Sequence, residues 1–236
     1  MKITTILFDL DGTLLPMDQD LFLKYYFGAL AKKLVPHGYD PELLIQSIWK
    51  GTGAMVKNDG TVTNETVFWK HFCGIFGEKA RMDEPVFEAF YREDFQKVQA
   101  SCGYTPFAAE IIALLKEKGL RVILATNPLF PRIATESRIR WAGMNPEDFE
   151  WITTYENSGF CKPNPDYYRE ILDKMELNPS ECLMVGNDVG EDMVAQQLGM
   201  EVFLVTDCLI HKGQGDISRY PQGSLQDLKE YFQNNL

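Results

Sequence analysis

The stretch Phe8-Asp9-Leu10-Asp11-Gly12-Thr13-Leu14 lies where an apolar segment ends and the chain turns. Residues 3–8 before it are short, apolar and rich in β-branched side chains, which predicts a buried strand. Asp9 and Asp11 are two positions apart, so their side chains lie on the same side if the strand geometry continues. Two carboxylates at such a short distance repel each other unless a cation or a proton lies between them. On its own, the pattern also fits a polar strand end followed by a surface turn.

Further polar segments follow expected strands or precede expected helices. Thr126-Asn127-Pro128 comes after the apolar segment 122–125, and its hydroxyl and backbone N–H groups suit a phosphate oxygen. Lys162-Pro163-Asn164-Pro165 places a lysine in a stiff loop before a helix. Gly186-Asn187-Asp188, with Asp192 beyond it, offers oxygen ligands for a hard cation such as Mg²⁺. Each segment alone also fits a turn, a solvated lysine or a helix cap, but their joint occurrence at successive strand ends indicates one site.

The second half of the chain alternates between strand and helix patterns. Strands are expected at 121–126, 151–154, 182–185 and 201–205, and helices at 106–118, 130–141, from 165, at 191–198 and from the capping box at 224–227. This alternation predicts a parallel sheet with helices on both faces. Residues from about 16 to 100 instead repeat apolar side chains at helical spacing, interrupted by a loop expected at 51–63. We therefore expect an α/β, Rossmann-like core of residues 1–15 and 104–236, with an inserted all-α domain at 16–103.

The composition and charge of the chain make some classes of binding partner unfavourable. The chain has 236 residues, with 23 Lys and Arg against 34 Asp and Glu, and a net charge of −11. Such an acidic chain makes nucleic acid and anionic membrane surfaces poor partners, and no apolar run approaches the roughly 20 residues that span a bilayer. The N-terminal segment is not a signal peptide by its pattern, and the five scattered cysteines are typical of reduced thiols in a cytoplasmic protein. The sequence favours neither a monomer nor a homodimer.

In this order, the four polar segments resemble the phosphatase branch of the haloacid dehalogenase-like (HAD) hydrolase superfamily. The match places Asp9-x-Asp11-x-Thr13 at motif one, Thr126 at motif two, Lys162 at motif three, and Gly186-Asn187-Asp188 with Asp192 at motif four. The resemblance covers the whole chain, and the helical segment occupies the position of that family's cap. Family members often carry Asp where this chain has Asn187. Since an amide supplies no charge, the direct metal ligand is assigned to Asp188.

The resemblance implies a role for each matched residue. Asp9 would be the nucleophile that forms an aspartyl-phosphate, and Asp11 would protonate the leaving alcohol and then activate water. Metal binding would use Asp9, the backbone carbonyl of Asp11, and Asp188. Phosphate binding would use Thr126, Asn127 and Lys162, while Asn187 and Asp192 would orient these groups. These roles describe a Mg²⁺-dependent phosphatase for a small phosphorylated metabolite.

The residues leave alternatives open. A phosphosugar mutase would use the same catalytic residues, and a non-catalytic binding protein would have no need to keep all four motifs. A dehalogenase would have no use for Asp11 as an acid. In the helical segment, Lys57 is a candidate substrate contact, although a solvated loop lysine is the simpler interpretation. The aromatic side chains there, Tyr26, Phe27 and Phe68 among them, are interpreted as domain core.

Overall fold

A six-stranded sheet with the order β3-β2-β1-β4-β5-β6 forms the centre of the computed structural model, which describes residues 2–213 and 215–235. All neighbouring strands run parallel. The strands are β1 (Thr5–Phe8), β2 (Arg121–Leu124), β3 (Trp151–Ile152), β4 (Cys182–Gly186), β5 (Glu201–Val205) and β6 (Gln222–Gly223). The expected parallel α/β core is therefore confirmed, and β6 is an additional edge strand that the sequence pattern did not indicate.

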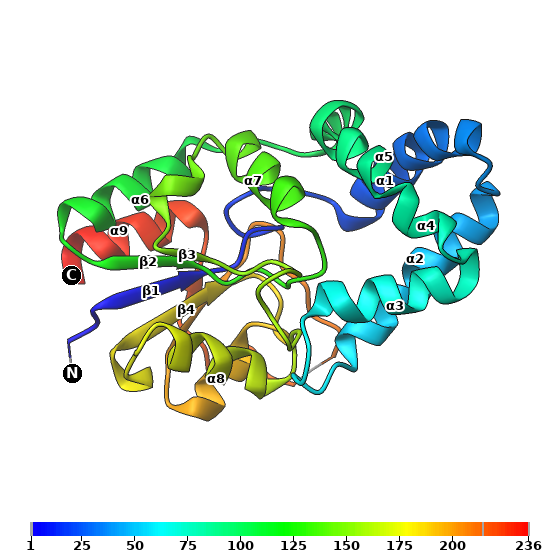
Figure 1. The fold of residues 1–236 in the computed structure, drawn as a ribbon. Helices are drawn as coiled ribbons and strands as arrows, with labels where there is room; N and C mark the ends of the chain where they lie inside the picture. The colour runs from blue at the N-terminus through cyan, green and yellow to red at the C-terminus, as the bar shows by residue number, and fades with distance from the viewer. Residues whose placement is uncertain (1, 214, 236) are drawn as a thin grey trace.

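Alternate side chains of the strands enter two different apolar clusters, because successive residues of a strand point to opposite faces. Ile6 and Phe8 belong to the cluster that includes residues of α6 (Pro106–Glu117), α7 (Arg132–Trp141) and α9 (Leu225–Asn235). Leu7 belongs to the other cluster, with α8 (Pro165–Lys174) and η6 (Met193–Leu198). Figure 1 shows α6 and α9 on one side of the sheet and α8 on the other, so helices cover both faces as expected.

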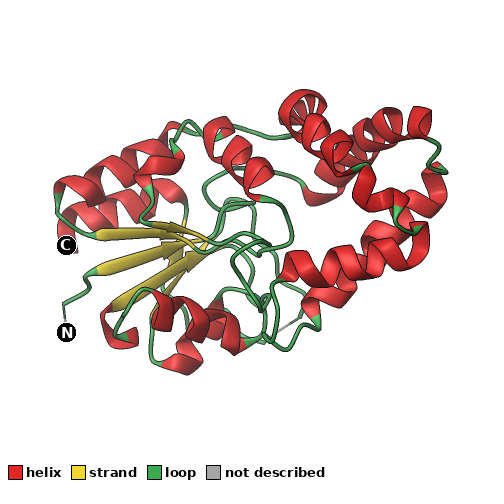
Figure 2. Ribbon diagram, in the orientation of Figure 1, coloured by secondary structure: helices red, strands yellow, loops and turns green. Residues whose placement is uncertain are grey.

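Between β1 and α6 the regular structure of the chain is helical (Figure 2). The elements are α1 (Gln19–Leu34), η1 (Val35–His37), α2 (Pro41–Val56), α3 (Asn64–Phe76), α4 (Lys79–Met82), α5 (Glu84–Ala89), η2 (Phe90–Asp94) and η3 (Phe95–Ser101). We call residues 16–103 the helical insert. Its two connections to the core lie side by side, since Met17 forms an isolated bridge with Cys102 and the Gly103 N–H donates to the Pro16 carbonyl at 2.7 Å.

Three expected boundaries were wrong. α2 continues through Gly51 to Val56, so the loop is shorter than expected. A Cβ at Gly51 would lie 2.7 Å from Cδ2 of Phe68, so this glycine serves the close packing of α2 on α3 and does not end the helix. The expected helix at 191–198 is a 3₁₀ helix that begins at Met193, and the helical pattern that runs to about residue 100 ends in three short elements, namely α5, a π-helical turn and a 3₁₀ helix.

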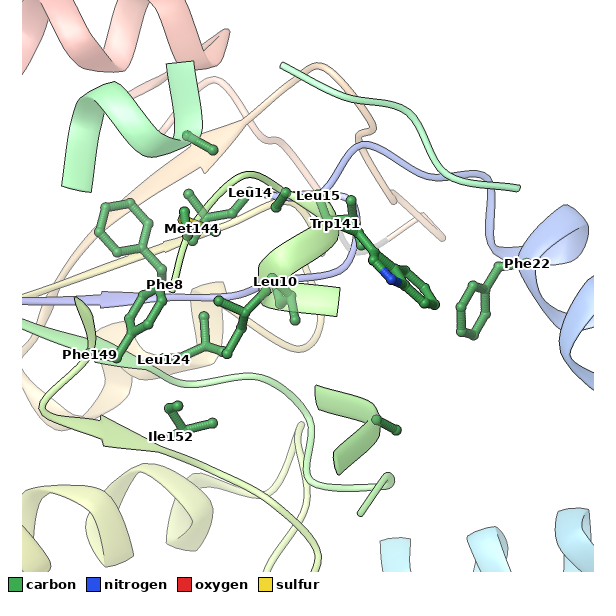
Figure 3. Packing of buried hydrophobic residues seen from close by; sticks show 14 of the residues in the cluster. Phe8, Leu10, Leu14, Leu15, Phe22, Leu124, Trp141, Met144, Phe149 and Ile152 are labelled. Atoms are coloured by element: carbon green, nitrogen blue, oxygen red, sulfur yellow. The ribbon is translucent and has the colours of Figure 1, made fainter. Parts of the chain in front are cut away.

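Aromatic rings join the helical insert to the core. Phe22 and Tyr26 of α1 pack edge-on against Phe130, with ring centroids 6.1 and 5.4 Å away. Phe95 of η3 packs on Trp141 of α7 at 4.9 Å. Figure 3 shows Trp141 and Phe22 pointing toward one another at this junction. In the part of the chain that the structure describes, no helix is both long and apolar enough to cross a membrane.

Candidate active site

The three central strands end level with one another. Phe8, the last residue of β1, is in register with Leu124 of β2 and Val185 of β4. The residues that follow, Asp9, Thr126 and Asp188, therefore emerge at one edge of the sheet, where open α/β folds bind their ligands. All three line one cavity of about 340 Å³, together with Asp11, Asn127, Asn187, Glu191 and Asp192.

Lys162 connects two of these carboxylates. Its ammonium lies 2.9 Å from Oδ1 of Asp9 and 2.7 Å from Oδ1 of Asp192, and its side chain is only 1% exposed. Burial by itself would lower the pKa of Lys162, but the carboxylates of Asp192 and Asp9 outweigh it and hold that pKa well above its usual value. The lysine is therefore a fixed positive charge beside the carboxylate of Asp9.

Asp192 is held from two sides. Its second oxygen accepts the backbone N–H of Asp188 at 2.9 Å, while its first accepts from Lys162. A Cβ on Gly186 would overlap with the Asp192 carboxylate, so only glycine at the end of β4 leaves room for this arrangement. Burial raises the pKa of Asp192, and the ion pair with Lys162 opposes this shift. Asp192 thus positions the lysine and the Asp188 loop at once.

Asp11 has a partner that the sequence did not reveal. One of its oxygens pairs with the guanidinium of Arg138, which is 1% exposed and lies 4.5 Å from the Phe130 ring centre. Its other oxygen is buried without a hydrogen-bond partner. Burial raises the pKa of Asp11 despite the lowering effect of Arg138, and the charge of Asp9 adds to the rise. A carboxyl with a raised pKa suits a proton donor and acceptor.

Asn187 ties three loops together. Its Oδ1 accepts the hydroxyl of Thr13 at 2.9 Å, and its Nδ2 donates to the Cys208 carbonyl at 2.7 Å. An aspartate could not donate the second of these bonds, which explains the amide at this position. Gly12 has a φ of +85° and no space for a Cβ beside the Asn187 amide, so the turn after Asp11 requires glycine.

The two expected phosphate-binding residues after β2 lie in the cavity wall. Thr126 is buried, and its carbonyl accepts hydroxyls of Thr153 and Tyr167 at 2.6 and 2.9 Å. Asn127 donates to a carboxylate oxygen of Glu191 at 2.9 Å and accepts the backbone N–H of Lys162 at 3.3 Å. Burial raises the pKa of Glu191. Glu191 is a cavity residue that the sequence analysis did not single out.

The donor set fits a magnesium ion. Oδ1 of Asp188 accepts the backbone N–H groups of Gly190 and Glu191 at 2.7 and 3.0 Å, which fixes the carboxylate and leaves Oδ2 for another partner. Among the backbone hydrogen bonds of residues 2–213 and 215–235, none is accepted by the carbonyl oxygen of Asp11, so this oxygen is available as a metal ligand. No group of three or more His, Cys, Asp or Glu side chains is arranged as a metal site in those ranges. Two carboxylates and a carbonyl agree with the preference of Mg²⁺ for a few protein oxygens and several waters.

Other residues singled out in the sequence lie elsewhere. Lys57 is exposed after α2 and borders a different, shallow surface hollow, so the structure does not bring it to the cavity. Tyr26 belongs to the main apolar cluster, and Phe27 and Phe68 pack against it, as expected from the sequence; all three also line the cavity, which the sequence did not indicate. Burial raises the pKa of the Cys161 thiol to about 12, which agrees with a packing role.

This fold and this set of strand-end residues define a class of enzyme. The family model of haloacid dehalogenase-like hydrolases matches residues 3–199. The chain therefore belongs to the haloacid dehalogenase-like hydrolases, as the motif resemblance implied.

Named relatives agree with this membership. YhcW of Bacillus subtilis (strain 168), which is named for a phosphatase activity, is 25% identical over 86% of this chain and 83% of its own length. Pyrophosphatase PpaX of Bacillus cereus (strain ATCC 10987) is 25% identical over 96% of this chain and 93% of its own.

Two solved structures share the fold at lower identity. The 2-haloacid dehalogenase of Pseudomonas syringae pv. tomato DC3000 has a TM-score of 0.65, 20% identity, and covers 98% and 99% of the two chains. The magnesium-bound HAD hydrolase YfnB of Bacillus subtilis has a TM-score of 0.57 and 17% identity, and covers 99% and 100%.

Proposed function

We propose that this chain is a Mg²⁺-dependent phosphatase that hydrolyses a small soluble phosphomonoester through an aspartyl-phosphate on Asp9. One observation carries the proposal: loops after β1, β2 and β4 bring Asp9, Asp11, Thr126 and Asp188 to one cavity, and the loop before α8 places the buried Lys162 ammonium 2.9 Å from Asp9. The phosphatase and pyrophosphatase names of the relatives support phosphate transfer, and the magnesium-bound neighbour supports the metal.

The carboxylate of Asp9 attacks phosphorus, and the bond from phosphorus to the alcohol oxygen breaks. Protonated Asp11 gives its proton to that oxygen, so a neutral alcohol departs. Asp11, now a carboxylate, takes a proton from water as the water oxygen attacks the phosphorus of the aspartyl-phosphate, and the bond from that phosphorus to the Asp9 oxygen breaks. Inorganic phosphate leaves, and both aspartates return to their starting states.

The charge of the transferring group is stabilised by fixed donors. Lys162 is buried and charged beside Asp9, so it stabilises phosphoryl oxygens without any rearrangement. Thr126 and Asn127 border the same space and supply hydrogen bonds. Asp9, the Asp11 carbonyl and Asp188 would hold Mg²⁺, which neutralises further phosphoryl charge when bound. Residues 1–15 and 104–236 form the catalytic core in this proposal, and the insert acts as the cap that excludes water.

The test is a product assay on 4-nitrophenyl phosphate and sugar phosphates, with Mg²⁺ and with excess EDTA. We expect inorganic phosphate and free alcohol with Mg²⁺, reversible loss of turnover in EDTA, and little activity with Ca²⁺, whose larger radius misplaces the reactants. An isomerised sugar phosphate without free phosphate would identify a mutase instead.

Asp9→Asn is the decisive variant, because an amide of the same shape cannot attack phosphorus. Turnover should fall by several orders of magnitude with circular dichroism unchanged. Asp173→Asn, on the exposed side of α8, is the matched control and should retain full activity. Near-native turnover in Asp9→Asn would contradict the proposal, and absence of turnover in both proteins would favour a non-catalytic protein.

A further inference from the structure

The cavity that contains Asp9 has two chemically different ends. Its floor carries the carboxylates described above. Its opposite wall comes from the helical insert and from the segment after β2, and it is aromatic. The rings on this wall include Phe22, Tyr26, Phe27, Trp49, Phe68 and Phe130. A phosphoryl group at the floor therefore directs its leaving group toward rings.

These rings form contacts with one another across the cavity wall. Phe27 and Trp49 are tilted against each other with centroids 5.6 Å apart, and Trp49 remains 49% exposed at the rim. The hydroxyls of Tyr26 and Tyr91 lie 3.0 Å apart, and burial raises the pKa of Tyr26 to about 12, so this polar pair is uncharged. The wall thus offers ring faces and neutral hydroxyls to a bound group.

Within residues 2–213 and 215–235, no lysine, arginine or histidine lines the cavity. The buried cations beside it, Lys162 and Arg138, are each paired with carboxylates of the floor. A second anionic group on the substrate would meet Asp11 or Glu191 without a compensating charge, and an unpaired charge is costly to bury.

We infer that the physiological substrate is a phosphomonoester whose leaving group is uncharged and carries an aromatic ring. This inference rests on the proposed phosphatase function and specifies its substrate class. It excludes phosphoglycolate and pyrophosphate as good substrates, although a pyrophosphatase is among the relatives. Aromatic groups gain from edge and face contacts with ring walls beyond what area burial alone provides.

The first test compares alkyl esters of similar intrinsic reactivity, so that differences report the pocket. kcat/KM for benzyl phosphate should exceed that for phosphoglycolate by about a hundredfold, because only the latter brings a second charge. It should exceed that for cyclohexylmethyl phosphate, which has the same size without the ring electrons, by roughly two- to tenfold. Equal or reversed preference in either pair overturns the inference.

The second test changes the wall. Trp49→Ala should raise KM for benzyl phosphate by roughly two- to tenfold and leave KM for phosphoglycolate unchanged. Tyr25→Ala is the matched control, because Tyr25 is 43% exposed on the same insert and does not border the cavity. Thr52→Lys places a cation in the wall and should raise kcat/KM for phosphoglycolate relative to benzyl phosphate. A uniform loss on both esters in Trp49→Ala contradicts a binding role.

The two proposals fail in different ways. If none of the esters is hydrolysed in an Asp9-dependent manner, the phosphatase function itself is wrong. If hydrolysis depends on Asp9 but phosphoglycolate or pyrophosphate is preferred, the phosphatase function stands and the aromatic substrate class is wrong.

Discussion

Arg138 is the residue whose importance depends most on tertiary structure. It lies 127 positions from Asp11 in the chain and meets it only because α7 packs over the end of β1. Its guanidinium orients the carboxyl that we propose as the acid for the leaving group. A residue in this position acts through Asp11 and need not touch the substrate.

Replacing Arg138 by methionine should therefore affect substrates unequally. kcat/KM should fall more for benzyl phosphate than for 4-nitrophenyl phosphate, because nitrophenolate departs without a proton and the alkoxide does not. Arg140→Met, on the exposed side of α7 and paired with Glu136, is the control and should change neither value. An equal fall for both esters would indicate a general structural defect.

Gly186 sets the position of Asp192 and, through it, of Lys162. Gly186→Ala forces the Asp192 carboxylate away, and a displacement of about 1 Å near the reacting atoms typically costs on the order of 10²-fold in kcat. Gly28→Ala serves as the control, because a Cβ there meets nothing within 4 Å. Steady-state kinetics with matched thermal melts separates loss of geometry from loss of fold. Unchanged kcat in Gly186→Ala would remove Asp192 from the positioning role.

Among individual residues, sequence analysis identified those that directly follow a strand. It missed those that reach the site only because their helix packs against the core. Asp9, Asp11 and Asp188 follow apolar strand segments, so their convergence follows from a parallel sheet. Arg138 lies within a helix among other arginines, and nothing local distinguishes it from an exposed one. The aromatic wall was missed because core and pocket aromatics share the same helical spacing.

Helix α2 shows how glycine can mislead at the scale of an element. A loop was expected from Gly51, yet Gly51 and Gly53 both lie inside the helix. Gly51 faces Phe68 of α3 at a distance that admits no side chain, whereas Gly53 faces open space. The low helix propensity of glycine was overridden at Gly51 by the packing of α2 on α3. At Gly53 it was overridden because the helix continues on both sides.

These two glycines predict opposite effects of the same substitution. Gly51→Ala should lower the free energy of unfolding by about 1–3 kcal/mol, because the new methyl group overlaps with the Phe68 ring. Gly53→Ala should raise it by about 0.5–1 kcal/mol, because alanine loses less backbone entropy in a helix. Urea unfolding of the two variants measures both. Stabilisation by Gly51→Ala would show that α2 and α3 are not closely packed there.

For the whole molecule, we expect a bound metal ion to raise the melting temperature, Tm. A ligand that binds only the folded chain at 100 times its dissociation constant contributes about 2.7 kcal/mol, or roughly 5–10 °C in Tm for a chain of this size. We expect Mg²⁺ to raise Tm and EDTA to reverse the rise. Asp188→Asn keeps the acceptor for the Gly190 N–H but weakens metal binding, so its Tm should not respond at the same Mg²⁺ concentration. An identical rise in that variant would place the ion elsewhere.

The strand order also has a consequence for the time course of synthesis. Of the six strands of the sheet, β1 is synthesised first, yet its two neighbours in the sheet begin at Arg121 and Cys182. The helices of residues 16–103 pack largely against one another, so they can assemble before the strands that pair with β1 have been synthesised. Asp9, the proposed nucleophile, is thus synthesised 153 residues before Lys162, and strand β4 and the proposed metal ligand Asp188 come later still. If Asp9 has the proposed role, a nascent chain that ends before Lys162 contains the nucleophile without the lysine and metal ligand that would let it attack phosphate esters.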